Sequence, residues 1–123
     1  MPTPQEVKET QRQSWNKFSA GWLKWDSFVM DMLRPTGEAM LKMAALGPGL
    51  EVLDVATGTG EPGLSAARRI GGGHVTAVDV AEEMVRIAGD KAAKAGLTNF
   101  QAQSYDGLKL PFPDGRFDVA LCR

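Results

Sequence analysis

The apolar residues of the first third of the chain recur at a helical spacing. Intervals of three and four residues separate the members of one stripe: Trp15, Phe18, Trp22, Trp25, Val29 and Leu33. Pro35 ends this pattern, and Thr36 can cap a second helix that carries Glu38 in its first turn and runs to Leu46. We therefore expect the chain to begin with helices, which end at the segment Gly47-Pro48-Gly49.

From residue 50 the pattern changes to short apolar runs that alternate with helical windows. The apolar runs predict buried strands at 50–56, 74–79, 99–103 and 117–122. Helices are expected at 61–70 and 81–95, each followed by glycine. The second of these helices should bury one face: Met84, Val85, Ala88, Ala92 and Ala95. Alternation of strands and helices predicts an α/β fold, with a parallel sheet covered by helices.

The aromatic stripe at 15–33 has two interpretations. Periodic apolar residues usually belong to a core, so the stripe can pack against the rest of the domain. Alternatively, the aromatic face closes as a lid over a bound small molecule. Only two of the fourteen glycines, but all three tryptophans, precede Gly47. We therefore divide the chain into an N-terminal helical lid or cap at 1–49 and a second unit at 50–123.

Composition and charge restrict the class of partner. With 123 residues, 43% of them hydrophobic, the chain fits one globular domain and not a disordered segment. Lysine and arginine number 14 against 15 acids, and neither sign forms a run, so charge favours no nucleic acid and no anionic membrane. No apolar stretch approaches the roughly 18 residues of a membrane span. A single cysteine builds no internal disulfide, and we expect a cytoplasmic protein.

A glycine-rich turn follows the first predicted strand. Glycine lets the backbone approach a ligand closely, and free amides at the start of a helix can bind it. The segment from Gly58 to Gly63 matches the dinucleotide fingerprint, and Asp79 lies about 20 residues further on, at the end of the next strand. There Asp79 would accept hydrogen bonds from two ribose hydroxyls. A dinucleotide-binding module is therefore one interpretation.

Two acids near the turn favour a different nucleoside. Asp54 lies in the first strand and Glu61 at the predicted helix start, where each would repel a pyrophosphate. They suit a ligand that is cationic at this end. S-adenosylmethionine is such a ligand, because it carries an ammonium and a sulfonium but no phosphate.

Three segments resemble class I S-adenosylmethionine-dependent methyltransferases, in particular the group that includes the ubiquinone and menaquinone biosynthesis enzymes. They are Glu51–Gly63, Val75–Met84 and Leu110–Cys122. Ala56 stands where the family has the first glycine of Gly-x-Gly-x-Gly. The stretch 110–118 is similar to the family's Leu-Pro-Phe-x-Asp-x-x-Phe-Asp segment before strand four.

The resemblance implies a set of cofactor-binding residues. Asp54 and the turn Ala56, Thr57, Gly58, Thr59 and Gly60 would hold the methionine portion of S-adenosylmethionine. Asp79 would hold the ribose hydroxyls, and Val80 with Met84 the adenine face.

The resemblance also places residues at the ends of the third and fourth strands. Asp106 and Gly107 stand where the family's acid accepts a hydrogen bond from the adenine amino group, and Tyr105 precedes them where glycine is more common. Cys122 and Arg123 end strand four, at the junction of cofactor and acceptor. Arg123 can pair with an acidic acceptor or with the cofactor carboxylate.

Methyl transfer needs few protein groups. The reaction is an in-line displacement of a methyl group that belongs to the cofactor, so the protein aligns a small-molecule acceptor and excludes water. His74 begins a strand and so lies far from the expected crevice, and Cys122 is read as a small hydrophobe. No histidine and cysteine cluster has metal-ligand spacing, and we assign no catalytic residue.

The expected fold is a Rossmann-like parallel sheet with strand order 3-2-1-4, in which strands five to seven are absent. The strand at 117–122 would then be an apolar edge strand, which invites pairing with another chain. We expect either a fragment of a longer enzyme or a homodimer through that edge. A chain that binds S-adenosylmethionine without turnover, or an oligomerising module, is the alternative to a methyltransferase.

Overall fold

A computed structural model describes all 123 residues as four helices and four strands. In chain order these elements are α1 (Pro4–Lys24), α2 (Asp26–Met43), β1 (Glu51–Val55), α3 (Gly63–Arg69), β2 (His74–Asp79), α4 (Glu82–Lys94), β3 (Phe100–Ser104) and β4 (Val119–Cys122).

The four strands form one parallel sheet in the order β3-β2-β1-β4. Asp54 of β1 lies in register with Ala77 of β2 and with Leu121 of β4. The predicted Rossmann-like α/β fold and its strand order are therefore confirmed. Strand order reverses between β1 and β4, and a ligand crevice forms outside the carboxyl ends of strands at such a point.

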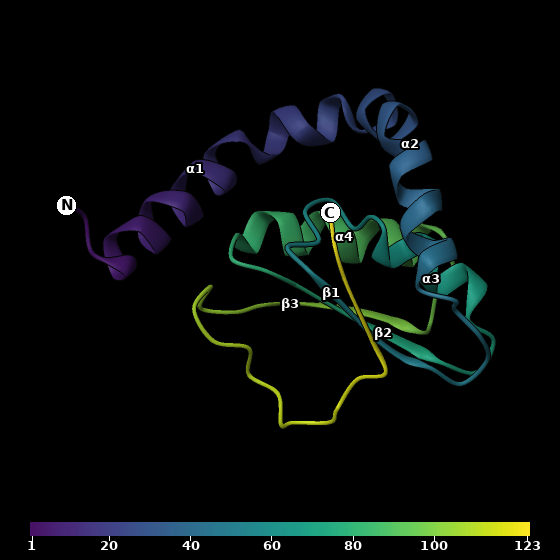
Figure 1. Cartoon of the computed structure of the whole chain (residues 1–123). Helices are drawn as coiled ribbons and strands as arrows, with labels where there is room; N and C mark the ends of the chain where they lie inside the picture. The colour runs from purple at the N-terminus through teal and green to yellow at the C-terminus, as the bar shows by residue number, and fades with distance from the viewer.

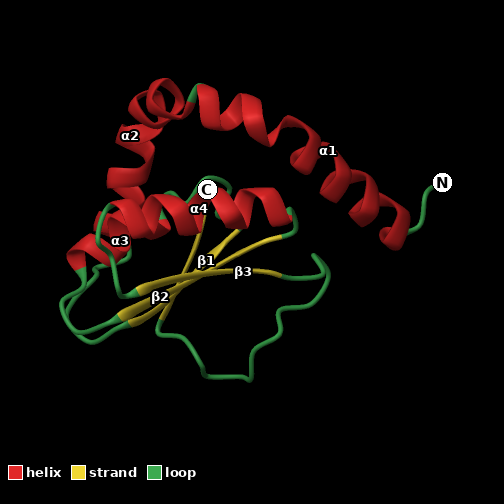
Figure 2. Ribbon diagram, turned by 180° about the vertical axis from the view of Figure 1, so that it is seen from behind, coloured by secondary structure: helices red, strands yellow, loops and turns green.

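The hydrophobic core lies between the sheet and α3 and α4, which cover the same face (Figures 1 and 2). Alternate strand residues point into it because side chains of a strand alternate between faces. The cluster consists of Leu41, Val52, Leu64, Ala66, Ala67, Ile70, Val75, Ala77, Ala88, Ala92, Phe100 and Leu121. The segment 105–118 runs on the opposite side of the sheet in both views.

Element boundaries differ from the sequence pattern in small ways. The helix expected at 61–70 begins at Gly63, because the preceding residues belong to the turn. The last strand begins at Val119, not at 117. On α4, Ile87 is buried and Ala95 is exposed, so the buried face lies slightly to one side of the predicted one.

The N-terminal helices form an arch over α4 and the carboxyl end of β4 (Figure 1). The chain breaks at Trp25 into two helices, and α2 continues through Pro35. The prediction that Pro35 ends a helix and that Thr36 caps the next one is therefore wrong. Proline leaves the carbonyl four residues earlier without a helical partner, but it does not forbid a helix that tertiary contacts support.

Those tertiary contacts lie in the second half of α2. Leu41 belongs to the hydrophobic core, and Glu38 pairs with Arg69 of α3 at 2.6 Å. Long-range contacts thus outweigh the local signal of the proline.

The aromatic stripe does not pack into the core. Phe18 and Trp25 are 58% and 59% exposed, and Trp15 and Trp22 are about 40% exposed. The core interpretation of the stripe is therefore wrong. The residues of the stripe instead either line the cavity described below or are exposed to solvent.

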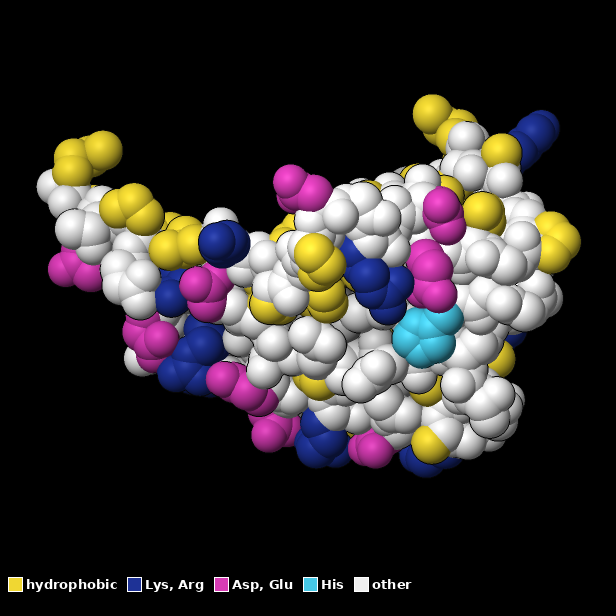
Figure 3. Space-filling view, turned by 90° about the horizontal axis from the view of Figure 1, so that it is seen from below, with side chains coloured by type: hydrophobic (Ala, Val, Ile, Leu, Met, Phe, Trp, Pro, Cys, Tyr) yellow, Lys and Arg dark blue, Asp and Glu magenta, His cyan; other side chains and the backbone are white.

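The remaining surface is mixed in charge. On the face drawn in Figure 3, acidic and basic side chains are interleaved. None of the helices combines the length and the apolar character that crossing a membrane requires.

Candidate functional site

A cavity of about 400 Å³ lies between the arch and the carboxyl ends of the strands. The arch contributes Trp15, Trp22, Val29, Met30 and Leu33. The body contributes Ala56, Thr57, Gly58, Thr59, Glu61, Asp79, Val80, Met84, Tyr105 and Arg123. The cavity therefore has an apolar roof and a floor built from strand ends and the glycine turn.

The glycine turn forms part of the floor, and its backbone takes conformations that ordinary residues avoid. Gly58 has φ of 58°, and Gly60 has φ of 117°. Ala56 also lies in the left-handed region, with φ of 56°, which costs a residue with a Cβ about 1 kcal/mol or more. This explains physically why the family has glycine where this chain has Ala56.

Asp79 joins the end of β2 to the turn. Its Oδ2 accepts a hydrogen bond from the Gly58 N–H at 2.8 Å, and its Oδ1 accepts one from the Ala81 N–H at 3.0 Å. The residue is only 7% exposed, yet it lines the cavity. Asp79 thus places a fixed negative charge at the cavity wall.

Asp54 lies behind the turn and does not line the cavity. Its Oδ2 accepts hydrogen bonds from the Thr57 hydroxyl at 2.7 Å and from the Gly63 N–H at 2.8 Å, at the start of α3. Its Oδ1 is buried without a partner. Burial raises the pKa of Asp54 to about 7, against the hydrogen bonds from Thr57 and Gly63, which lower it.

The roof is aromatic and aliphatic. The rings of Trp15 and Trp22 lie 5.8 Å apart between centroids, at an angle of 42°. Val29, Met30 and Leu33 of α2 complete the lining from above. Four of these five residues belong to the aromatic stripe. The helical spacing in the sequence therefore identified most of the roof, but it did not show that the roof covers a cavity.

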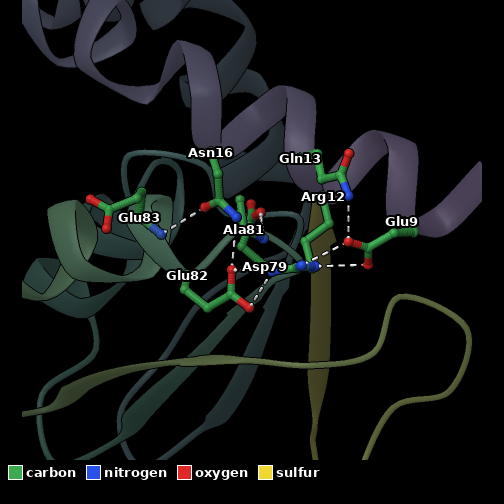
Figure 4. A network of polar contacts seen from close by, with 8 residues as sticks. All are labelled: Glu9, Arg12, Gln13, Asn16, Asp79, Ala81, Glu82 and Glu83. Atoms are coloured by element: carbon green, nitrogen blue, oxygen red, sulfur yellow. Dashed lines mark hydrogen bonds and ion pairs between the residues drawn. The ribbon is translucent and has the colours of Figure 1, made fainter.

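Polar contacts attach α1 to the start of α4 (Figure 4). Ala81, the N-cap residue of α4, makes no side-chain hydrogen bond to the helix. The Asn16 side chain of α1 instead accepts a hydrogen bond from the Glu83 N–H at 3.0 Å. Asn16 also donates to Glu82 at 2.8 Å, and Arg12 pairs with Glu82 at 3.0 Å. A side chain of α1 thus accepts a hydrogen bond from a backbone N–H group in the first turn of α4, which has no partner within that helix.

A second attachment reaches the glycine turn itself. The Thr59 hydroxyl donates to Asp26 of α2 at 2.7 Å, and Lys91 of α4 pairs with the same carboxylate at 2.8 Å. The position of α2 is therefore linked directly to the floor of the cavity.

Eight of the thirteen expected cofactor-binding residues line the cavity: Ala56, Thr57, Gly58, Thr59, Asp79, Val80, Met84 and Tyr105. Their cofactor roles stay predictions. Burial, and next the charge of Asp79, raise the pKa of the Tyr105 phenol, which favours its neutral form.

The other five residues lie away from the lining: Asp54, Gly60, Asp106, Gly107 and Cys122. A Cβ on Gly60 would lie 2.6 Å from Leu64 of α3, and one on Gly107 would lie 2.8 Å from Val80, so both glycines serve close packing. The Asp106 carboxylate accepts hydrogen bonds from the Leu108 and Lys109 N–H groups, both at 2.8 Å.

The same two backbone hydrogen bonds lower the pKa of Asp106. Its carboxylate therefore stabilises a local turn at the surface. Cys122 is a free, exposed cysteine at the end of β4.

Two charged residues that the sequence placed near the ligand, without naming them as cofactor-binding, also line the cavity: Glu61 and Arg123. Their signal was positional, since one follows the glycine turn and the other follows β4. His74 begins β2, at the amino end of the sheet and away from the cavity. No three histidine, cysteine or acidic residues lie close enough together to hold a metal ion.

The amino-acid sequence is similar to that of known methyltransferases. It is 38% identical over 96 residues to nocamycin O-methyltransferase from Saccharothrix syringae. The matched segment covers 77% of this chain and 34% of that protein. It is also 37% identical over 79 residues to demethylmenaquinone methyltransferase from Listeria monocytogenes. This second matched segment covers 63% of this chain and 33% of that protein. The chain thus spans about a third of the length of these curated relatives.

The structure is similar as well. A SAM-dependent methyltransferase from Aquifex aeolicus matches with a TM-score of 0.64 and 38% identity, over 70% of this chain and 46% of that one. A family described as "Methyltransferase domain" matches residues 52–123, which include the glycine turn, Asp79 and β4. Because this match covers more than half of the chain, the protein belongs to the methyltransferase domain family.

Proposed function

We propose that the cavity binds S-adenosylmethionine and that the protein transfers its methyl group to a small-molecule acceptor. The observation that carries this proposal is the charge and position of the cavity. It lies at the carboxyl ends of the strands, where the order reverses, and its lining holds Glu61 and Asp79 against the single cation Arg123.

The charge of the cofactor complements this lining. S-adenosylmethionine carries an ammonium, a sulfonium and one carboxylate, so its net charge is positive. A pyrophosphate would place negative charge beside Glu61 and Asp79 without a second cation to compensate. The lining therefore supports the sulfonium nucleoside over a dinucleotide, which was the competing interpretation of the glycine turn.

The residues of the floor fit the parts of the cofactor as the family resemblance implies. Asp79 would accept the ribose hydroxyls, and Val80 with Met84 would contact the adenine. The turn from Ala56 to Thr59 would hold the methionine portion. All of these residues line one continuous cavity, which supports the assignment.

When bound, the cofactor supplies an electrophilic methyl group, and the chain orients the two reactants and excludes water. We infer that residues 1–49 form the lid that does so and that residues 50–123 form the cofactor-binding unit. The apolar roof of Trp15, Trp22 and Leu33 supports this division, because it would displace water from the cavity. No side chain is assigned as a general base.

A small-molecule acceptor is supported by two relatives, one named as an O-methyltransferase of nocamycin and the other as a methyltransferase of demethylmenaquinone. A cavity of about 400 Å³ is consistent with an acceptor of that size. We further propose a cytoplasmic location. The one cysteine of the chain is free, as is usual in a reducing compartment.

Isothermal titration with S-adenosylmethionine, S-adenosylhomocysteine and NAD tests the cofactor. We expect both sulfur nucleosides to bind in the micromolar range or tighter, and NAD to give no measurable heat. Binding of NAD without a response to either sulfur nucleoside would contradict the proposal and restore the dinucleotide interpretation.

Turnover is tested separately from binding. A screen of small-molecule acceptors with isotope-labelled S-adenosylmethionine should transfer the label to at least one compound. A protein that binds the cofactor but labels no acceptor would favour the alternative of a non-catalytic binding chain.

A further inference from the structure

The bend of the arch is joined to the body through one carboxylate. A single residue, Trp25, separates α1 from α2, and the chain changes direction there (Figure 1). No side chain caps α2 at this point. Asp26, the first residue of α2, instead uses both carboxylate oxygens for other elements: Oδ1 accepts from the Thr59 hydroxyl of the glycine turn, and Oδ2 pairs with Lys91 of α4.

The ion pair of Asp26 and Lys91 is the least exposed in the chain. Their side chains are 18% and 24% exposed, whereas every other ion pair includes a side chain that is more than a third exposed. Thr59 is buried as well. Salt and water screen partly buried charges less than exposed ones, so this contact is firmer than the surface pairs.

Thr59 depends on this contact for its position. It lies between Gly58 and Gly60, whose positive φ values permit conformations that other residues avoid. The backbone of Thr59 forms no hydrogen bond with another backbone group. Its hydroxyl, which donates to Asp26, is therefore the group that fixes this part of the turn, and Thr59 lines the cavity.

The same carboxylate stands at the start of the helix that covers the cavity. Val29, Met30 and Leu33 line the roof within about two helical turns after Asp26. Neither Asp26 nor Lys91 lines the cavity itself. A displacement of this part of α2 would move the roof and separate Asp26 from Thr59 at the same time, because one helix carries both.

We infer that Asp26 is a positioning residue, which holds Thr59 in place for the cofactor only while the arch covers the cavity. The inference rests on the proposed function and adds to it a link between cofactor binding and closure of the lid. Coupling of this kind is reciprocal, so a ligand that binds the fixed turn also favours the closed arch.

Titration with S-adenosylhomocysteine measures the effect of the contact on the turn. We expect Asp26→Ala to weaken this ligand about tenfold, because the Thr59 hydroxyl loses its acceptor. Asp26→Asn should bind within about threefold of the unaltered protein. Its amide oxygen still accepts from Thr59, although the ion pair with Lys91 is lost. An affinity of Asp26→Asn as weak as that of Asp26→Ala would contradict a role through the hydroxyl.

Asp31→Ala is the matched control for Asp26→Ala. Asp31 lies on the same helix, is exposed and pairs only with Arg34 of that helix. This variant should bind S-adenosylhomocysteine as the unaltered protein does. Unchanged affinity in Asp26→Ala as well would overturn the inference, while the proposed function would stand.

A double-mutant cycle separates a direct link from a general loss of stability. Thr59→Val removes the hydroxyl and should by itself weaken S-adenosylhomocysteine about tenfold. If Asp26 acts through Thr59, the double variant should bind within about twofold of either single variant, because all three remove the same contact. Losses that multiply would show that the two residues act separately and would overturn the inference.

Proteolysis reports the link to the arch. At saturating S-adenosylhomocysteine, the ligand should slow cleavage before Gly47 in the unaltered protein and in Asp31→Ala. The same saturation should protect Asp26→Ala and Thr59→Val several-fold less, because the occupied turn is no longer joined to α2. Equal protection in all four proteins would contradict the coupling.

Thermal unfolding verifies that each variant folds. If Asp26→Ala does not fold, Thr59→Val carries the test, since it leaves the ion pair of Asp26 and Lys91 in place and must still reduce both affinity and protection. Failure of the unaltered protein to bind S-adenosylhomocysteine would instead contradict the proposed function, and the inference with it.

Discussion

Asp54 and Asp79 stand at neighbouring strand ends but have different surroundings. Asp79 accepts two backbone hydrogen bonds and still faces the cavity, whereas Asp54 is buried behind the turn and leaves one oxygen without a partner. The first acid is placed for a ligand, and the second holds the turn onto α3. Spacing along the chain identified both as acids of the site, but only side-chain geometry separates the two roles.

Replacing Asp79 with alanine should abolish measurable cofactor binding. The loss of two charge-assisted hydrogen bonds to ribose hydroxyls corresponds to roughly 100-fold or more in affinity. The Gly58 and Ala81 N–H groups also lose their acceptor, so stability should fall by about 2 kcal/mol while unfolding stays cooperative. Titration calorimetry and thermal unfolding measure the two effects.

Asp106→Ala is the matched comparison for Asp79→Ala. The family resemblance assigns Asp106 to the adenine amino group, yet its carboxylate is exposed and lies outside the cavity lining. We expect this variant to bind S-adenosylmethionine within about twofold of the unaltered protein. A loss as large as that of Asp79→Ala would show that the cavity extends to the end of β3 when the cofactor binds.

Asp54 should make stability depend on pH. Its pKa of about 7 in the folded protein exceeds the ordinary value of 3.8, so unfolding releases a proton between these pH values. The free energy of unfolding therefore falls as pH rises from about 4 to 7, by up to about 4 kcal/mol from this residue. Asp54→Asn should remove this slope, which denaturant unfolding at pH 4 to 8 can measure.

The exposed Asp114 supplies the control for that series. Asp114→Asn should unfold with the same pH dependence as the unaltered protein. If Asp54→Asn also kept the full slope, the buried carboxylate would not be its source.

At the scale of elements, the arch of α1 and α2 is attached by polar contacts at two places. Asn16 and Arg12 hold α1 to the start of α4, and Asp26 holds α2 to Thr59 and Lys91. Polar contacts of this kind each contribute only about 1 kcal/mol, so α1 and the first half of α2 can open while Leu41 stays in the core. Such an element fits a lid better than a structural support.

Cofactor binding should therefore alter the conformation of the arch more than that of the sheet. We expect S-adenosylhomocysteine to shift tryptophan emission and to slow proteolysis at sites before Gly47. Trp15→Phe and Trp22→Phe should each reduce the emission shift, because both rings line the cavity.

Trp25→Phe is the control, since Trp25 is exposed and does not line the cavity. It should leave the emission shift intact. Emission and proteolysis that do not respond to the ligand would contradict the lid.

At the scale of the whole molecule, β4 pairs with β1 on one side and has no neighbouring strand on the other. Exposed strand edges of this kind pair with other chains. The two expectations for this edge were a longer enzyme and a homodimer, and we keep the homodimer as the proposal to test: light scattering at micromolar concentration should give twice the 13.2 kDa of one chain. Ala120→Lys, at an exposed position of β4, should shift the equilibrium to monomer.

A monomer at every concentration would contradict the dimer. The cavity itself is lined by residues of one chain, so cofactor binding and dimer formation can succeed or fail independently.

Much of the fold was determined by the sequence alone. The change of apolar period at residue 50 identified every strand and the helices between them, because these periods follow from local backbone geometry. Once the strands were known to be parallel, right-handed connections left few possible orders. The glycine turn and Asp79 were likewise found from spacing, since a turn after a buried strand favours glycine where φ is positive, even though Ala56 also takes such a φ here.

Only the tertiary structure decided what depends on surfaces that meet across the chain. The buried Leu41 and the Glu38–Arg69 pair explain why α2 continues through Pro35. Contacts between arch and floor decide that Trp15 and Trp22 cover a cavity and are not part of the core. The same long-range packing brings Arg123 to Gly37, 86 positions apart in the numbering of the chain. No local pattern encodes such a meeting, because it depends on how separate elements dock.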